Sequence, residues 1–202
     1  MEFILKLDET LFLLFNKTLA NPVFDVVMPF ITDADNWTIP LVICWLSLII
    51  FGGKKGRITA LLVVFTITLS DQMSSAVIKP LVGRLRPCHP DYFVEGGRFL
   101  IGMKRTLSFP SSHAANNAAM AMLFSYQYPR FKWIFISLAF MVGYSRTYVG
   151  VHYPFDVLGG FLLGVLCALV IIGLFKAIVK FWKYFKDNRN RVAKAEMLQE
   201  DV

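Results

Sequence analysis

Three short segments of this chain carry side chains suited to holding a phosphate group and breaking its ester bond: residues 79–87, 109–113 and 145–156. Together they contribute fixed positive charges, two histidines, a carboxylate and a pair of serines. Guanidinium and ammonium groups bind phosphoryl oxygens, and histidines transfer protons or act as nucleophiles near neutral pH. Because each segment lies at the end of an apolar run, we expect this chemistry at a membrane surface.

The first segment places two cations at helical spacing. Lys79 and Arg86 are seven residues apart, so a continuing helix would carry both on one face. Arginine offers a planar donor fork and lysine a point charge, and both suit phosphate oxygens. The alternative is that each side chain snorkels from the end of a span. The alignment of the two, followed by Pro87, favours phosphate binding, whereas Arg84 lies off this line and is expected to face lipid headgroups.

The second segment predicts the start of a helix. Pro110 is followed by Ser111 and Ser112, which can cap an Ala-rich helix. A helix N-terminus presents free backbone N–H groups and a partial positive charge, which favour an anion there. Ordinary capping would explain the serines equally well. His113 lies on the first turn, where an imidazole is placed to protonate a leaving oxygen.

The third segment pairs a histidine with a carboxylate. Arg146 ends an apolar run, and His152 and Asp156 are four residues apart with Pro154 at a plausible helix start between them. If this turn is helical, the histidine and the carboxylate share one face. The carboxylate then fixes the imidazole tautomer and leaves the other ring nitrogen as a free nucleophile. A buried hydrogen bond that merely joins two helices is the alternative, and the neighbouring cations favour catalysis.

The composition indicates one integral membrane domain. The chain has 202 residues, of which 56% are hydrophobic and 17% charged, too few charges for a soluble domain of this length. We expect an all-α, polytopic membrane helix bundle with five clear spans, because a span needs about 20 apolar residues. The predicted spans are residues 37–52, 58–78, 111–126, 133–149 and 155–175.

The two ends of the chain differ in composition from the predicted spans. Residues 1–36 mix apolar runs with Asn16, Lys17 and Asp25, so they form either interfacial amphipathic helices or a sixth span. Residues 1–180 are expected to form the membrane domain, and residues 181–202 a basic cytoplasmic tail.

Basic residues predict the orientation. Segments 53–57 and 127–132 and the tail are basic and share one side of a five-span bundle, which the positive-inside rule assigns to the cytoplasm. The three chemical segments then lie on the opposite, outer face. Residues 80–109 are basic as well, and Arg98, Lys104 and Arg105, together with Arg84, are expected to contact headgroups unless they serve only as interfacial anchors.

Other classes of function fit poorly. Nucleic-acid binding is not expected, because the chain offers no soluble domain with a basic face. The three cysteines have no disulfide or metal-ligand spacing, and no carboxylate cluster would hold Mg²⁺ well. We therefore expect no cofactor and no metal, and the lipid bilayer and a membrane lipid substrate as the partners.

The three segments together match the signature of a known family. The chain resembles the type-2 phosphatidic acid phosphatase superfamily of membrane lipid phosphatases, whose signature is K-x6-R-P, P-S-G-H and S-R-x5-H-x3-D. Every spacing matches, within a resemblance that covers about residues 59–175, and the one departure is Ser112 in place of glycine. The matching residues are Lys79 with Arg86 and Pro87, Pro110 to His113, and Ser145 and Arg146 with His152 and Asp156.

The resemblance implies a metal-independent mechanism. His152 would attack phosphorus and form a phosphohistidine, Asp156 would orient it, and His113 would protonate the leaving oxygen and later activate water. The phosphoryl oxygens would be held by Lys79, Arg86, Ser111, Arg146 and the Ser112 amide. The chain resembles bacterial phosphatases of undecaprenyl pyrophosphate, phosphatidylglycerophosphate and lipid A 1-phosphate. The resemblance therefore implies a multi-pass protein of the bacterial inner membrane, with its active site facing the periplasm or the cell exterior.

The signature residues are expected to contact only the phosphate group, so they do not identify the lipid that carries it. By analogy with compact relatives, undecaprenyl pyrophosphate is expected first, with phosphatidylglycerophosphate, phosphatidic acid and lipid A 1-phosphate as alternatives. A lipid phosphotransferase, in which an alcohol replaces water, is a second enzymatic alternative. A transporter of anionic lipids is the non-enzymatic one, and the spacing of His152 and Asp156 argues against it. The sequence does not predict an oligomeric state.

Overall fold

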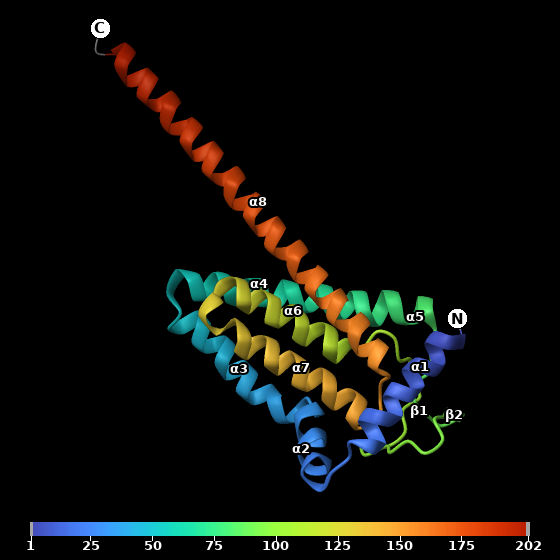
Figure 1. The fold of residues 1–202 in the computed structure, drawn as a ribbon. Coiled ribbons are helices and arrows are strands. Elements are labelled where there is room, and N and C mark those ends of the chain that lie inside the picture. The colour runs from blue at the N-terminus through green and yellow to red at the C-terminus, as the bar shows by residue number, and fades with distance from the viewer. Residues whose placement is uncertain (1, 201–202) are drawn as a thin grey trace.

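The computed structural model describes the backbone of residues 2–200 and the side chains of residues 2–191, and the fold is almost entirely helical (Figure 1). Two short strands pair antiparallel in the loop before α6, with Cys88 opposite Phe93. The helical elements are α1 (Glu2–Leu13), η1 (Leu14–Thr18), α2 (Pro22–Thr32), α3 (Asp35–Ile50), α4 (Gly53–Gln72), η2 (Met73–Ile78), α5 (Lys79–Val82), α6 (Ser112–Gln127), η3 (Pro129–Phe131), α7 (Lys132–Tyr148) and α8 (Pro154–Glu200), and the strands are β1 (Cys88–His89) and β2 (Tyr92–Phe93).

The five predicted runs correspond to helices, but five spans are not established. Among the residues that the structure describes, two helices qualify as membrane spans by length and composition, Gly53–Val82 and Pro154–Arg191, and α3 is a shorter apolar helix. The N-terminal helices qualify only together, as Glu2–Thr18 and Pro22–Thr32, and they are bent by 116°. The N-terminal segment is therefore not one straight sixth span.

Helix α6 lies at the centre of the bundle, against α4, α7 and α8 (Figure 1). Its contact with α8 is close because Gly164 faces it, and a Cβ atom there would lie 2.0 Å from the carbonyl oxygen of Ala115. Farther from the site, Leu62, Leu123 and Ile172 form an apolar cluster between α4, α6 and α8. This packing fixes the start of α6 beside the start of α8.

One end of the bundle gathers the segments that carry the chemistry. In Figure 1 the end of α5, the β1–β2 ribbon, α1 and the start of α8 all lie at the right-hand side. Helix α4 continues through the wide turn of η2 into α5, which ends where Gly83 adopts a left-handed conformation, with φ of 65°. The single helix expected through Lys79 and Arg86 is therefore interrupted, and Arg86 follows on non-helical backbone.

Helix α8 is much longer than its predicted span. It runs for 47 residues without a break and extends away from the bundle (Figure 1). The boundary predicted between the membrane domain and the basic tail, at residue 180, falls inside this helix. The division into a membrane domain and a cytoplasmic tail stays a prediction.

Candidate active site

His152 and Asp156 lie together in the buried centre of the site. His152 is in the turn between α7 and α8, and Asp156 is on the first turn of α8, which begins at Pro154. The Nδ1 atom of His152 is 3.5 Å from Oδ2 of Asp156, and the two side chains are 1% and 0% exposed. The pairing predicted from their spacing is therefore present, although the backbone at His152 is not helical.

Ser108 lies between these two side chains. Its hydroxyl donates a hydrogen bond of 2.5 Å to Oδ2 of Asp156 and lies 3.3 Å from Nδ1 of His152. The backbone N–H of Tyr153 donates to the same carboxylate oxygen at 2.9 Å. Ser108 is not among the residues predicted from the sequence, although its position two residues before Pro110 places a hydroxyl next to the second segment.

The other ring nitrogen of His152 faces a guanidinium. Nε2 is 3.1 Å from Nη1 of Arg86. The same Nη1 donates to the carbonyl oxygen of Val151, and Nε of Arg86 donates to that of Thr106. Since a guanidinium only donates, Nε2 must be the unprotonated nitrogen, and the ring proton lies on Nδ1, toward Asp156 and Ser108. The lone pair of the imidazole is thus directed toward the basic side of the site.

The electrostatic environment keeps His152 neutral. Burial, followed by the positive charges of Arg86, Arg146 and Lys79, holds the pKa of His152 well below its usual value. A neutral imidazole at neutral pH is the state in which Nε2 can act as a nucleophile.

The remaining cations of the signature, Lys79 and Arg146, bind backbone and side-chain oxygens of other segments. The ammonium of Lys79 donates to the carbonyl oxygen of Pro110 at 2.6 Å, which joins the first segment to the second. Arg146 is buried and donates through Nη1 to the hydroxyl and carbonyl oxygens of Thr32 in α2. Its Nε atom is buried and has no hydrogen-bond partner among the residues that the structure describes. That N–H is a donor available to an anion.

The second segment begins α6 as the sequence predicts. Ser111 is the N-cap, and its hydroxyl accepts the N–H of Ala114 at 3.4 Å. The hydroxyl of Ser112, the residue in place of glycine, lies 3.0 Å from the hydroxyl of Ser74 in η2, so it is tied to the α4 side of the site. His113 follows on the first turn and is half-buried.

The four residues expected at headgroups separate into two pairs. Lys104 and Arg105 are exposed, and Arg105 pairs with Asp91 at 3.3 Å. Arg98 instead binds Asp25 of α2 at 2.6 Å. Arg84 lies between two buried carboxylates rather than at a headgroup position, since both of its terminal nitrogens are paired.

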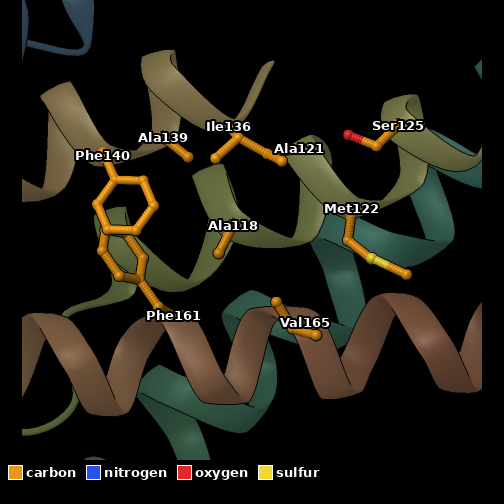
Figure 2. Close-up of a pocket in the computed structure, with 9 residues that line it drawn as sticks. All are labelled: Ala118, Ala121, Met122, Ser125, Ile136, Ala139, Phe140, Phe161 and Val165. Atoms are coloured by element: carbon orange, nitrogen blue, oxygen red, sulfur yellow. The ribbon is translucent and has the colours of Figure 1, made fainter. Parts of the chain in front are cut away.

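A separate hollow lies between α6, α7 and α8. Its volume is about 230 Å³, and Figure 2 shows small, aliphatic and aromatic side chains around it, with the hydroxyl of Ser125 as the polar exception. The hollow contains none of the signature residues, and we assign no chemistry to it. It is lined by Ala118, Ala121, Met122, Ser125, Ile136, Ala139, Phe140, Phe161 and Val165.

Comparison with known proteins identifies the family. The model of the PAP2 superfamily matches residues 59–180, which include all three segments. The chain belongs to the PAP2 superfamily. A lipid A 4'-phosphatase of Bacteroides thetaiotaomicron is 34% identical over 81% of this chain and 75% of its own length. An undecaprenyl-diphosphatase of Sulfolobus acidocaldarius is 36% identical over 58% of this chain and 65% of its own.

A solved structure agrees in fold. The transmembrane PAP2-type phosphatidylglycerolphosphate phosphatase of Bacillus subtilis superposes with a TM-score of 0.65 and 25% identity, and the match covers 88% of this chain and 89% of that one. Membership of this family confirms the predicted enzyme class, a hydrolase acting on lipid phosphates, and its place in a membrane.

Proposed function

We propose that this PAP2 hydrolase transfers the phosphoryl group of its lipid to Nε2 of His152. The observation that carries the proposal is the asymmetry of that imidazole: Nε2 faces Arg86, while Nδ1 faces Asp156 and Ser108. An N–P bond forms at Nε2 as the P–O bond to the lipid breaks. The carboxylate stabilises the positive charge that develops on the ring.

The two halves of the reaction share one acid–base group. His113 gives a proton to the leaving oxygen in the first half, as the lipid alcohol or lipid phosphate departs. In the second half His113 takes a proton from water, the water oxygen attacks phosphorus, and the N–P bond breaks to release phosphate. His152 is thereby returned to its neutral form.

The basic groups hold the phosphoryl oxygens in this proposal. The clamp comprises Lys79, Arg86, Ser111, the Ser112 amide and Arg146. Arg146 supplies its buried Nε–H, and Arg86 exchanges His152 for a phosphoryl oxygen when substrate binds. Positioning and charge stabilisation are the main requirements of phosphoryl transfer, and fixed cations and a helix N-terminus supply both without a metal.

For the lipid we propose a lipid A phosphate, with undecaprenyl pyrophosphate second. The similarity to the lipid A 4'-phosphatase extends over 81% of the chain, whereas that to the undecaprenyl-diphosphatase covers 58%. The broader match reaches beyond the phosphate-binding segments, and the lipid must be distinguished there. We place the site at the outer face of the cytoplasmic membrane, because the basic segments 53–57 and 127–132 favour the cytoplasm for the opposite end.

A phosphate-release panel tests this function. Purified protein in detergent is expected to hydrolyse lipid A phosphate with a kcat/KM about tenfold above those of undecaprenyl pyrophosphate, phosphatidylglycerophosphate and phosphatidic acid. Vanadate, which mimics five-coordinate phosphorus, should inhibit, and excess EDTA should not. Loss of activity in EDTA would contradict the metal-free mechanism. Phosphate recovered on a second lipid instead of in solution would indicate a phosphotransferase.

Ser108 provides a test of the orientation of His152. Ser108→Ala removes the hydroxyl between Nδ1 and Asp156. We expect kcat to fall about 10- to 100-fold while KM stays unchanged, because a hydrogen bond to a charged group is worth roughly 1.5–3 kcal/mol. Steady-state kinetics on the preferred lipid measure the change. Ser70→Ala, which removes a buried hydroxyl from α4 outside the site, is the matched control. Equal activity of both variants would reject an orienting role for Ser108.

A further inference from the structure

We propose that Asp8, on the N-terminal helix α1, is a positioning residue of the active site that acts on Asp156 through Arg84. This inference rests on the proposed function, in which Asp156 orients the nucleophile His152. The family model begins at residue 59, so the shared signature gives no role to residue 8.

A single guanidinium joins the two carboxylates. Nη2 of Arg84 is 2.7 Å from Oδ2 of Asp8, and Nη1 is 2.9 Å from Oδ1 of Asp156. Both carboxylates are 0% exposed, and the side chain of Arg84 is 19% exposed. A buried ion that loses its partner is strongly destabilised. The position of each of these three charged side chains therefore depends on the other two.

Asp8 also fixes the turn of α8 that carries Asp156. Its Oδ1 accepts the backbone N–H of Phe155 at 2.9 Å, across 147 positions of the sequence. Phe155 is the second residue of α8, and the first four N–H groups of a helix have no partner within it. Asp8 therefore caps α8 from another helix, one residue before Asp156.

The face of α1 that carries Asp8 also packs against the site through an apolar side chain. Phe12, one turn after Asp8, is fully buried, and its ring lies 5.6 Å from that of Tyr153. The guanidinium of Arg84 stacks over the same tyrosine ring, 4.0 Å from its centre. Phe3 on α1 is by contrast 78% exposed. The helix is thus held at the site by the face that carries Asp8 and Phe12.

The arrangement divides the charge of Arg84 between two acceptors. With Asp8 ionised, the guanidinium is neutralised in part before it reaches Asp156, whose second oxygen remains directed at Ser108 and His152. If Asp8 is made neutral, Arg84 attracts Asp156 alone. The carboxylate is then less able to stabilise the positive charge that develops on His152 during transfer. Neutralising Asp8 should therefore slow the phosphoryl transfer without weakening lipid binding.

Asp8→Asn tests this positioning role in the full-length protein. In detergent, with lipid A phosphate as the probe and the other panel lipids beside it, we expect kcat to fall about 10- to 100-fold, with KM within about twofold of wild type. Asp187→Asn, an exposed change near the other end of α8, is the matched control. Arg84→Lys keeps the charge but loses the two-armed fork, so the same fall in kcat is expected. The double variant should lose little more than either single one, because the residues act as one unit.

The outcomes separate this inference from the proposed function. Wild-type kcat in Asp8→Asn, or a rise in KM at constant kcat, overturns the positioning role if His152→Ala is inactive. If His152→Ala is active, the proposed mechanism itself fails. Should Asp8→Asn not yield folded protein, Arg84→Lys decides in its place, and wild-type kcat there overturns the inference.

Discussion

Replacing His152 with alanine is expected to slow phosphate release by about 10,000-fold or more, the scale seen when a nucleophile that works as part of a unit is removed. The variant loses the nitrogen that attacks phosphorus, while the cations that bind phosphate remain. Affinity for a non-hydrolysed lipid phosphate should therefore change little. Initial rates of phosphate release from purified protein, together with lipid binding, measure the two effects.

Detection of the phosphohistidine intermediate tests the role of His152 directly. Wild-type protein quenched during turnover of radiolabelled lipid should carry phosphate that is stable to base and released by acid, as expected for phosphohistidine. His152→Ala should carry none. His89→Ala is the matched control, because this third histidine lies in β1 and its Nδ1 accepts the N–H of Asp91. Substantial phosphate release by His152→Ala would reject the mechanism.

Local signals in the sequence predicted the helical elements well. The serines after Pro110 indicated the start of α6, and Ser111 is its N-cap. Pro154 likewise marked the start of α8. Capping and proline placement depend on neighbours in the chain, so they are visible in a single sequence. The number of spans was less accessible, because it depends on how the helices lie in the bilayer and not only on apolar length.

Lys79 and Arg86 lie together at the site, as predicted, but the helical spacing from which this was predicted is not present. Lys79 and Arg86 were expected on one face of a continuing helix, whereas Gly83 ends that helix between them. Both residues still contact the other two segments, Lys79 at Pro110 and Arg86 at His152. Tertiary packing, and not helical periodicity, brings them there.

The residues that contact the signature residues from other segments could not be predicted from the sequence. Ser108, Asp8 and Thr32 have no signature spacing, and each acts through a contact that forms only after distant segments pack together. The sequence predicts Arg84 at the membrane surface, because its two carboxylate partners lie far away in the chain. A single sequence reveals groups that share one local segment, and it does not reveal such long-range pairs.

The two ring nitrogens of His152 face groups of different charge. The guanidinium of Arg86 lies at Nε2 of His152. The carboxylate of Asp156 lies at Nδ1, and Arg84 joins it to that of Asp8. An incoming phosphate is attracted to the Nε2 side, and the charge formed on the ring is stabilised from the Nδ1 side. In the proposed mechanism the proton for the leaving group comes from His113, on the first turn of α6.

Replacing His113 with alanine is expected to reduce phosphate release from lipid substrates by about 1,000-fold, because proton transfer by a positioned side chain contributes roughly 100- to 10,000-fold. A lipid alkoxide is a poor leaving group and needs the proton. Para-nitrophenyl phosphate releases a much weaker base, so the first half of its reaction should lose far less in this variant. His152→Ala, in contrast, should lose activity on both substrates.

Labelling distinguishes the two halves of the reaction in this variant. With para-nitrophenyl phosphate, His113→Ala should release a burst of nitrophenol equal to the enzyme present and then slow, because water is no longer activated to break the N–P bond. Phosphohistidine should accumulate in parallel. Equal losses on the lipid and the aryl ester, with no burst, would show that His113 does not transfer the proton. His113 would then only bind the phosphate, and the donor would have to be another group at the start of α6.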